Sequence, residues 1–240
     1  MFNHEKSYVI IDAGNTSIKL AIIENAKIVV VYRLLSLDEI IPFVLEKTVV
    51  CGSVTNHDFK GLVEKHGGVY VQITYSVTLP FKSAYKSMET VGIDRLCNIA
   101  SASSTFPRTN VLVIDIGTCI KFDFLSNHGI YKGGSIAPGI SLRYKSLNDY
   151  TSKLPLLDIK KPTPLIGANT LHAIQSGIIN GMTHEIQGLI SRYENDFEDL
   201  QILITGGDAS YFDFPQKSNI FANKNLTLEG IVEIYEINTL

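Results

Sequence analysis

An internal repeat constrains the fold of this chain more than any other feature of its sequence. Residues 9–20, VIIDAGNTSIKL, resemble residues 112–122, LVIDIGTCIKF, with one residue fewer in the second copy. In each copy an apolar run meets an acidic, glycine-containing turn and a second apolar run follows, which predicts a β-hairpin. The copies lie one small domain apart, so we expect a duplicated α/β unit with domains at 1–109 and 110–240. The aligned pairs are Asp12 with Asp115, Gly14 with Gly117, Thr16 with Thr118, Ile18 with Ile120, and Lys19 with Lys121.

The composition fits two small domains and excludes several classes of protein. The chain has 240 residues, which at ~150 residues per domain corresponds to about 1.6 domains. With 45% apolar and 19% charged residues it can bury a core, which excludes a disordered or fibrous chain. The net charge is −3 and no basic run exceeds Lys160–Lys161, so we expect no nucleic-acid partner.

The cysteines and the N-terminal residues indicate the compartment. Cys51, Cys97 and Cys119 are odd in number and widely spaced, which favours reduced thiols over disulfides or a zinc site. No apolar stretch has the length of a signal peptide core or a membrane span. We therefore expect a cytoplasmic protein without a membrane partner.

Apolar runs alternate with stretches of helical periodicity, which indicates an α/β fold. Asn169 is the expected N-cap of the longest helix. We predict a loop over 151–168 and partly helical structure over the closing residues 228–240. Further strands are predicted at 27–34, 48–54, 69–74 and 200–207, and helices at 36–47, 58–67, 93–104, 142–150 and 170–193.

The first candidate site is the turn that begins at Asp12, between two apolar strands. Gly14 allows backbone N–H groups to approach an anion, and Asn15 and Thr16 offer short donors. Asp12 can hold hydrated Mg²⁺, and Lys19 can neutralise phosphate charge. A plain hairpin turn can have the same sequence. The second copy and a third glycine turn, TGGD at 205–208, favour a phosphate-binding arrangement.

The second candidate site is Gly92-Ile93-Asp94-Arg95, at the start of a predicted helix. An acidic residue in the first turn stabilises a helix through its dipole and needs no catalytic role. In the functional interpretation, Asp94 accepts the proton of a substrate hydroxyl. Arg95 then donates hydrogen bonds to carboxylate or amide oxygens of the substrate.

The third candidate is the glycine-rich stretch GIYKGGSIAPG at 129–139. Four glycines and a proline in eleven residues suit a close approach of the backbone to a ligand. The alternative is a connection between strands.

Five motifs that follow one another along the chain resemble the type III pantothenate kinase family. They are DxGNTxxK at 12–19, GxDR at 92–95, DxGT at 115–118, GxYxGGxIxPG at 129–139 and GxNT at 167–170. The resemblance implies the actin-like ATPase fold of the sugar-kinase superfamily, in which two tandem RNase H-like domains have an ATP cleft between them. It also implies that a cytoplasmic homodimer phosphorylates pantothenate with ATP to 4′-phosphopantothenate, the first step of coenzyme A biosynthesis.

The resemblance assigns roles by position along these motifs. Asp94 would be the catalytic proton acceptor. Asp115 would bind a monovalent cation, K⁺ or NH₄⁺, in addition to the Mg²⁺ that accompanies ATP. Thr170 would reach the substrate from the partner of the homodimer. ATP would contact Asp12, Ala13, Gly14, Asn15, Thr16, Ser17, Ile18, Lys19 and Thr118, and pantothenate would contact Tyr85, Gly92, Ile93, Asp94, Arg95 and Thr170.

One segment departs from the family pattern. The family usually has a small residue at the position of Cys119 and a threonine at that of Lys121. Alternation along the strand from Asp115 leaves open which way Lys121 points. It is either a solvated lysine, or its ammonium group lies near the cation site and weakens the requirement for K⁺.

Small residues along the longest helix bear on oligomeric state. Gly177, Gly181 and Gly188 permit close packing of another helix, either within the monomer or in the homodimer that the resemblance implies.

Two other functions stay open at this point. One is another small-molecule kinase of the superfamily, although the Cys/His zinc cluster of one large sugar-kinase group is absent. The other is a non-catalytic regulatory accessory protein on the same fold. The presence of Asp12, Lys19, Asp94, Arg95 and Asp115 argues against a loss of catalysis.

Overall fold

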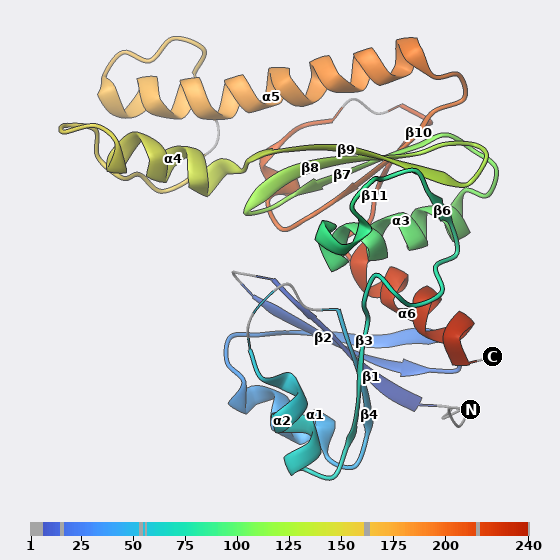
Figure 1. Cartoon of the computed structure of the whole chain (residues 1–240). Helices are drawn as coiled ribbons and strands as arrows, with labels where there is room; N and C mark the ends of the chain where they lie inside the picture. The colour runs from blue at the N-terminus through green and yellow to red at the C-terminus, as the bar shows by residue number, and fades with distance from the viewer. Residues whose placement is uncertain are drawn as a thin grey trace. The chain divides into compact units, whose positions relative to one another are not determined.

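The computed structural model describes residues 7–14, 17–52, 55, 57–160, 164–214 and 217–239. They form an α/β fold whose contacts divide the chain into two compact units (Figure 1). Unit 1 consists of Met1–Arg108, Leu125–Gly133 and Asn225–Leu240, and unit 2 consists of Thr109–Phe124 and Gly134–Lys224. The domain division drawn from the sequence repeat, 1–109 and 110–240, stays a prediction.

A five-stranded sheet with the strand order β3-β2-β1-β4-β5 forms the framework of unit 1. The first three strands run antiparallel, whereas β4 and β5 run parallel to β1. Asp12 pairs directly with Lys19 in the β1–β2 hairpin, which confirms the first predicted hairpin. The strands are β1 (Ser7–Ala13), β2 (Ile18–Glu24), β3 (Lys27–Leu34), β4 (Thr48–Cys51) and β5 (Val69–Gln72).

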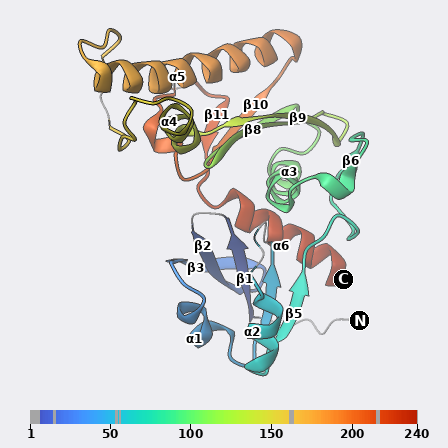
Figure 2. The same cartoon turned by 60° about the vertical axis from the view of Figure 1, so that its left-hand side comes forward.

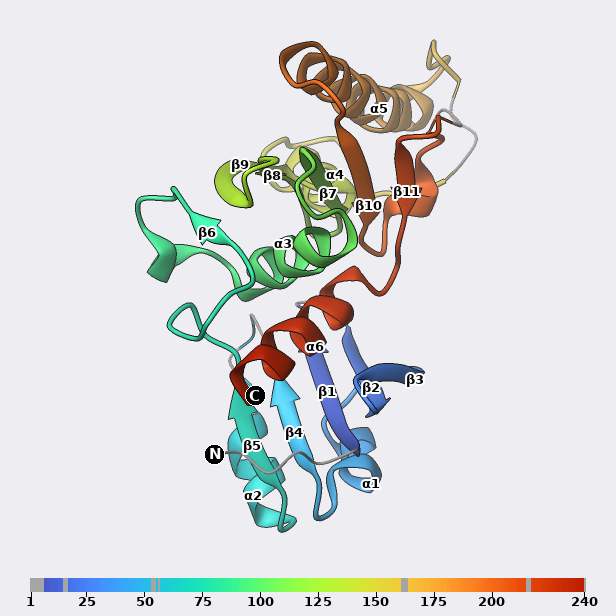
Figure 3. The same cartoon turned by 90° about the vertical axis from the view of Figure 1, so that its right-hand side faces the viewer.

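Helices cover both faces of this sheet. Val9 and Ile11 pack with residues of α1 (Ile41–Val44) and α2 (Phe59–Lys65). Side chains alternate along a strand, so Tyr8 points the other way, and its ring lies 4.6 Å from that of Tyr235. Tyr235 belongs to α6 (Leu226–Thr239), which packs beside α3 (Ile93–Thr105), as Figure 3 shows. Burial on both faces explains why β1 is a continuous apolar run.

A second sheet has the strand order β11-β10-β7-β8-β9-β6. β7, β10 and β11 run parallel, and β7 is hydrogen-bonded to β8, which confirms the second predicted hairpin. β6, the last residue of β8 (Leu125) and the first residues of β9 (130–133) belong to unit 1, and the remaining strand residues belong to unit 2. The strands are β6 (Lys82–Ser83), β7 (Val111–Ile116), β8 (Cys119–Leu125), β9 (Ile130–Pro138), β10 (Gln201–Thr205) and β11 (Ile220–Ala222).

Two helices cover one face of the unit 2 strands (Figure 2). They are α4 (Ile140–Asp149) and α5 (Thr170–Asp196). α5 presents buried residues such as Ile178, Met182 and Ile186 to the side chains of β7, β8 and β10. The predicted cap is confirmed, because the Asn169 side chain accepts a hydrogen bond from the His172 N–H at 2.9 Å.

The glycine-rich stretch is mostly β9 and not a loop. A Cβ on Gly134 would lie 1.6 Å from the carbonyl oxygen of Phe122, and one on Gly139 would lie 2.0 Å from that of Gly117. The close approach of the chain to itself therefore accounts for these two glycines, and the close approach of a ligand is not needed to explain them. Among the described residues, no helix is long and apolar enough to cross a membrane.

Candidate active site

The first hairpin turn lies at the carboxyl end of β1. Gly14 donates its N–H to the carbonyl oxygen of Ser17 at 3.2 Å, and Ala13 and Ile18 are buried on either side. A Cβ on Gly14 would come no closer than 3.8 Å to a described atom, so packing there does not require glycine. The predicted ATP-binding residues Asn15 and Thr16 lie outside the described residues.

The start of α3 reaches the same end of the sheet. Gly52, directly after β4, donates its N–H to the Ile11 carbonyl oxygen at 2.9 Å. A Cβ on Gly52 would lie 3.6 Å from the Ile93 side chain and only 2.7 Å from that of Ile231. The first turn of α3 is therefore packed against the carboxyl ends of β1 and β4.

This packing brings Asp12 and Asp94 near one buried group. Cys97, one turn into α3, is fully buried. Burial raises the pKa of the Cys97 thiol well above its ordinary value, and the negative charges of Asp12 and Asp94 raise it further. Two of the carboxylates predicted to act in the site thus lie close enough to influence the same thiol.

Asp94 is held at the N-terminus of α3 by a local interaction. Its Oδ1 atom accepts a hydrogen bond from the Arg95 N–H at 2.8 Å. Gly92 is the N-cap residue, and a Cβ there would lie 2.5 Å from this oxygen. The glycine therefore leaves the space into which the Asp94 carboxylate folds.

Arg95 joins an aromatic stack in unit 1. Its side chain is 4% exposed, and its guanidinium carbon lies 5.8 Å from the centre of the Tyr85 ring. Tyr85 in turn stacks on Tyr131 of β9, with ring centres 5.8 Å apart and an angle of 18° between the planes. Gly133 has φ +93°, and a Cβ there would lie 2.8 Å from the Tyr85 ring. Sequence reasoning missed Tyr131 and Gly133 as supports of Tyr85, although both belong to the motif at 129–139.

The second hairpin carries an ion pair at the end of β7. The Lys121 Nζ atom lies 2.7 Å from Oδ2 of Asp115, and the two side chains are 15% and 14% exposed. Lys121 therefore points toward Asp115, which answers the question that strand alternation left open. Asp115 is also the register partner of Thr205 on β10.

The glycine turn after β10 packs against the same strand. Gly206 has φ +99°, and a Cβ there would lie 2.2 Å from the Ile116 carbonyl oxygen. The Asp208 N–H donates to that oxygen at 2.9 Å. Burial raises the pKa of the half-buried Asp208 carboxyl above its ordinary value.

Thr170 is the first residue of α5 and is exposed. The preceding Gly167 lies so close to the helix that a Cβ there would be 2.2 Å from the Ala173 nitrogen. The predicted site residues thus fall into two groups. Asp12–Lys19, Tyr85 and Gly92–Arg95 belong to unit 1, and Asp115, Thr118 and Thr170 belong to unit 2.

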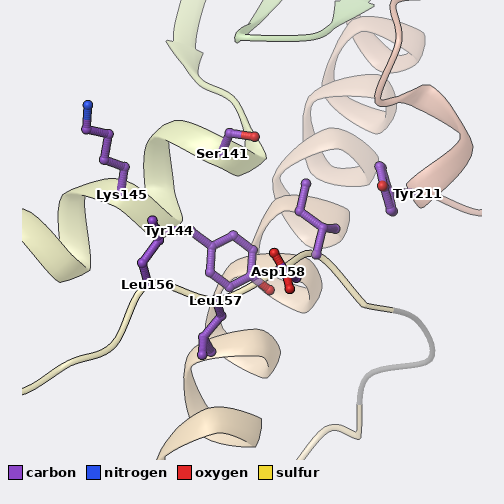
Figure 4. A pocket seen from close by; sticks show the side chains of 8 residues that line it. Ser141, Tyr144, Lys145, Leu156, Leu157, Asp158 and Tyr211 are labelled. Carbon is purple, nitrogen blue, oxygen red and sulfur yellow. The ribbon is translucent and has the colours of Figure 1, made fainter.

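A cavity of about 530 Å³ in unit 2 contains none of the predicted site residues (Figure 4). The Tyr144 hydroxyl beside it has no hydrogen-bond partner in the described part of the chain. Burial raises the pKa of this hydroxyl. The lining residues are Ser141, Tyr144, Lys145, Leu156, Leu157, Asp158, Ile159 and Tyr211.

Solved structures identify the class of fold. A Sinorhizobium meliloti protein provisionally described as a 2-dehydro-3-deoxygalactonokinase matches with a TM-score of 0.56 and 12% identity, over 97% of this chain and all of that one. A Campylobacter jejuni protein provisionally described as a conserved transcriptional activator of the Baf family matches with a TM-score of 0.65 and 21% identity, over 96% of this chain and 98% of that one. This chain therefore shares the α/β fold of these two proteins.

Sequence relatives identify the family within that class. A family model described as type III pantothenate kinase matches residues 39–192. The type III pantothenate kinase of Christiangramia forsetii is 40% identical, over 96% of this chain and 98% of its own length. The chain belongs to the type III pantothenate kinase family, which confirms the resemblance drawn from the five motifs.

Proposed function

We propose that this chain transfers the γ-phosphoryl group of ATP to the primary hydroxyl of pantothenate and so begins coenzyme A biosynthesis. Membership of the family supports the reaction. The observation that carries it to particular residues is the packing of the start of α3, which bears Asp94, against the carboxyl ends of β1 and β4, where Asp12 lies. A phosphate-binding turn and a proton acceptor would then lie at one end of one sheet.

ATP would bind through the turn between β1 and β2. The backbone from Ala13 to Ile18 would offer N–H groups to its phosphates, and Thr118 of the second hairpin would add a contact. Lys19, the register partner of Asp12, would neutralise phosphate charge. Asp12 supplies the carboxylate oxygen that Mg²⁺ prefers, and the bound ion would offset the charge of the phosphates.

Asp94 would accept the proton of the pantothenate hydroxyl as that oxygen bonds to the γ-phosphorus and the bond to ADP breaks. Its orientation would come from two neighbours. The Arg95 N–H binds Oδ1, and Gly92 leaves room for the carboxylate.

Pantothenate would bind beside Arg95 and Tyr85. A guanidinium is a planar donor suited to the carboxylate or amide oxygens of this substrate. The stack of Tyr85 on Tyr131 fixes the ring that Arg95 faces, so the guanidinium would be oriented before the substrate arrives. Ile93 would contribute an apolar contact at the start of α3.

We infer from the repeat that residues 1–109 and 110–240 are the two RNase H-like domains and that ATP binds in a cleft between them. The two hairpins support this inference, because each ends in an Asp that faces a Lys. In this arrangement the Asp12 and Asp115 turns would approach the phosphates from opposite domains.

A homodimer in the cytoplasm is part of the proposal. Cβ atoms added at Gly177, Gly181 and Gly188 of α5 would meet nothing within 4 Å. Packing within the described chain therefore does not explain these glycines, each of which costs about 1 kcal/mol of helix stability relative to alanine. Leu165 and Ile166, just before α5, are 76% and 83% exposed. A second copy packed on α5 would cover this region and could bring Thr170 to the substrate.

The function is tested by coupled ADP-release assays with ATP, Mg²⁺ and pantothenate. Asp94→Asn should lower kcat by ~10²–10⁴-fold, because asparagine keeps the oxygen that binds the Arg95 N–H but cannot accept the proton. Asp38→Asn, at an exposed acidic position of the same unit, should keep full activity.

Two results would change the assignment. A fully active Asp94→Asn enzyme would remove the proton-acceptor role from Asp94. A wild-type protein that hydrolyses or transfers phosphate with other alcohols but not with pantothenate would be another small-molecule kinase, and one with no turnover at all would favour the regulatory function.

A further inference from the structure

We propose that the Lys121 ammonium group takes the place of a monovalent cation at Asp115, so that the phosphoryl transfer of this chain does not require K⁺ or NH₄⁺. The Nζ atom lies 2.7 Å from Oδ2 of Asp115, at the end of β7. The inference rests on the proposed kinase function and concerns the second hairpin alone.

The charge of Asp115 is already compensated within unit 2. Only 14% of its side chain is exposed, and a carboxylate so shielded from water is costly unless a positive charge lies nearby. The ammonium group supplies one positive charge at hydrogen-bond distance. A second cation at the same carboxylate would be repelled by the ammonium and would have to displace it.

The chemistry of the surroundings also disfavours a bound K⁺. K⁺ exchanges its water shell for several oxygen ligands at once. At Asp115 an ammonium group, and not a further oxygen ligand, lies 2.7 Å from the carboxylate, so the residues there do not fit the monovalent cation that the family resemblance implies.

The internal repeat gives an independent reason to regard this lysine as part of the site. Lys121 is the repeat equivalent of Lys19, and Asp115 is the equivalent of Asp12. In the first hairpin, Asp12 and Lys19 are direct register partners. Both hairpins thus present an Asp and a Lys side by side, so the second lysine lies beside the Asp of its hairpin, as does the one proposed to face the phosphates.

The first measurement compares wild-type turnover in K⁺ and in tetramethylammonium at equal ionic strength. Tetramethylammonium is too large to reach the shielded Asp115 carboxylate, so its salt serves as the inert control. Wild-type activity should differ by less than about twofold between the two salts. Lys121→Thr should lose about 10- to 100-fold in tetramethylammonium, which is the value of one hydrogen bond to a charged group, and K⁺ should restore the activity. Lys153→Thr, which removes an exposed lysine of unit 2, should behave as wild type.

A second measurement does not depend on turnover. The Tm of the substrate-free protein is followed as K⁺ replaces tetramethylammonium. The Tm of Lys121→Thr should rise with K⁺, because an ion that binds only the folded state stabilises it, whereas the wild-type Tm should stay constant. Lys121→Met serves in the same way if the threonine variant does not fold.

The outcomes separate this inference from the proposed function. A wild-type enzyme that K⁺ activates tenfold or more overturns the inference and leaves the kinase function in place. A folded Lys121→Thr protein that K⁺ neither activates nor stabilises also overturns it, since Asp115 would then be no cation site. A wild-type protein inactive toward pantothenate in both salts contradicts the function, and the Tm measurement still tests the site.

Discussion

Replacing Gly92 with alanine should slow phosphoryl transfer without unfolding the protein. A Cβ at this position would lie 2.5 Å from Oδ1 of Asp94, and an ordinary contact begins near 3.4 Å. The carboxylate would have to move by roughly 0.9 Å, and a misplacement of ~1 Å in a catalytic group can cost ~10²-fold in rate. The expected loss in kcat is therefore about 10²-fold, or about 2.7 kcal/mol of transition-state stabilisation.

Stability should change little in this variant. Gly92 has φ −58° and ψ 136°, angles that alanine adopts without strain. The clash involves the end of a flexible side chain and no backbone atom, so Asp94 can rotate away. Alanine makes the unfolded chain less flexible, which stabilises the folded state, but it is a poorer N-cap residue than glycine. These two effects should nearly cancel, so that the free energy of unfolding changes by less than about 1 kcal/mol.

The assay is a double-mutant cycle with Asp94→Asn, in which kcat and Tm are measured for each protein. If Gly92 acts through Asp94, the double variant should be no slower than Asp94→Asn alone. Losses that multiply would refute the reasoning, because Gly92 would then contribute independently of the carboxylate. A large fall in Tm for Gly92→Ala would also refute it.

Three further predictions concern stability and assembly. Gly230→Ala should lower the free energy of unfolding by ~1–3 kcal/mol, visible as a lower Tm, because the Cβ would lie 1.7 Å from the Cys97 carbonyl oxygen, which cannot rotate away. Asp208→Asn should raise the Tm at pH 7, since burial raises the pKa of this carboxyl and its ionisation then costs stability as pH rises through the folded-state pKa. That gain should shrink toward pH 4, and a gain that grows in acid would contradict the reasoning. Gly181→Leu should shift the protein from dimer to monomer in light scattering. Gln187→Leu, elsewhere on the same helix, is the control and should leave the dimer intact if the glycine face is the contact. Equal effects of the two substitutions would argue against that face.

Much of the fold could be predicted because its signals are local. The two hairpins follow from apolar runs that meet an Asp–Gly turn, and Asp12 and Lys19 pair as a short hairpin requires. The start of α5 was predictable because Asn169 caps it through its own side chain. The family could also be named, because five of its motifs follow one another along the chain. The roles of the individual site residues stay predictions.

Other features depend on contacts between distant residues, and the sequence alone could not supply them. The orientation of Lys121 depends on how a turn with one residue fewer sets the strand register, and alternation cannot decide that. The glycine-rich stretch became β9 because Gly134 lies against the backbone of Phe122, a contact that local composition does not reveal. The support of Tyr85 by Tyr131 likewise joins two segments far apart in the chain.

The packing of α6 on α3 has a consequence for how the protein matures during synthesis. Thr227 of α6 donates a hydrogen bond to Asn98 of α3 at 2.9 Å across 129 residues of sequence. The helix that carries Asp94 and Arg95 therefore cannot complete its packing until α6 has left the ribosome. A nascent or truncated chain without α6 would contain every proposed catalytic residue and still lack the support of the helix that positions two of them.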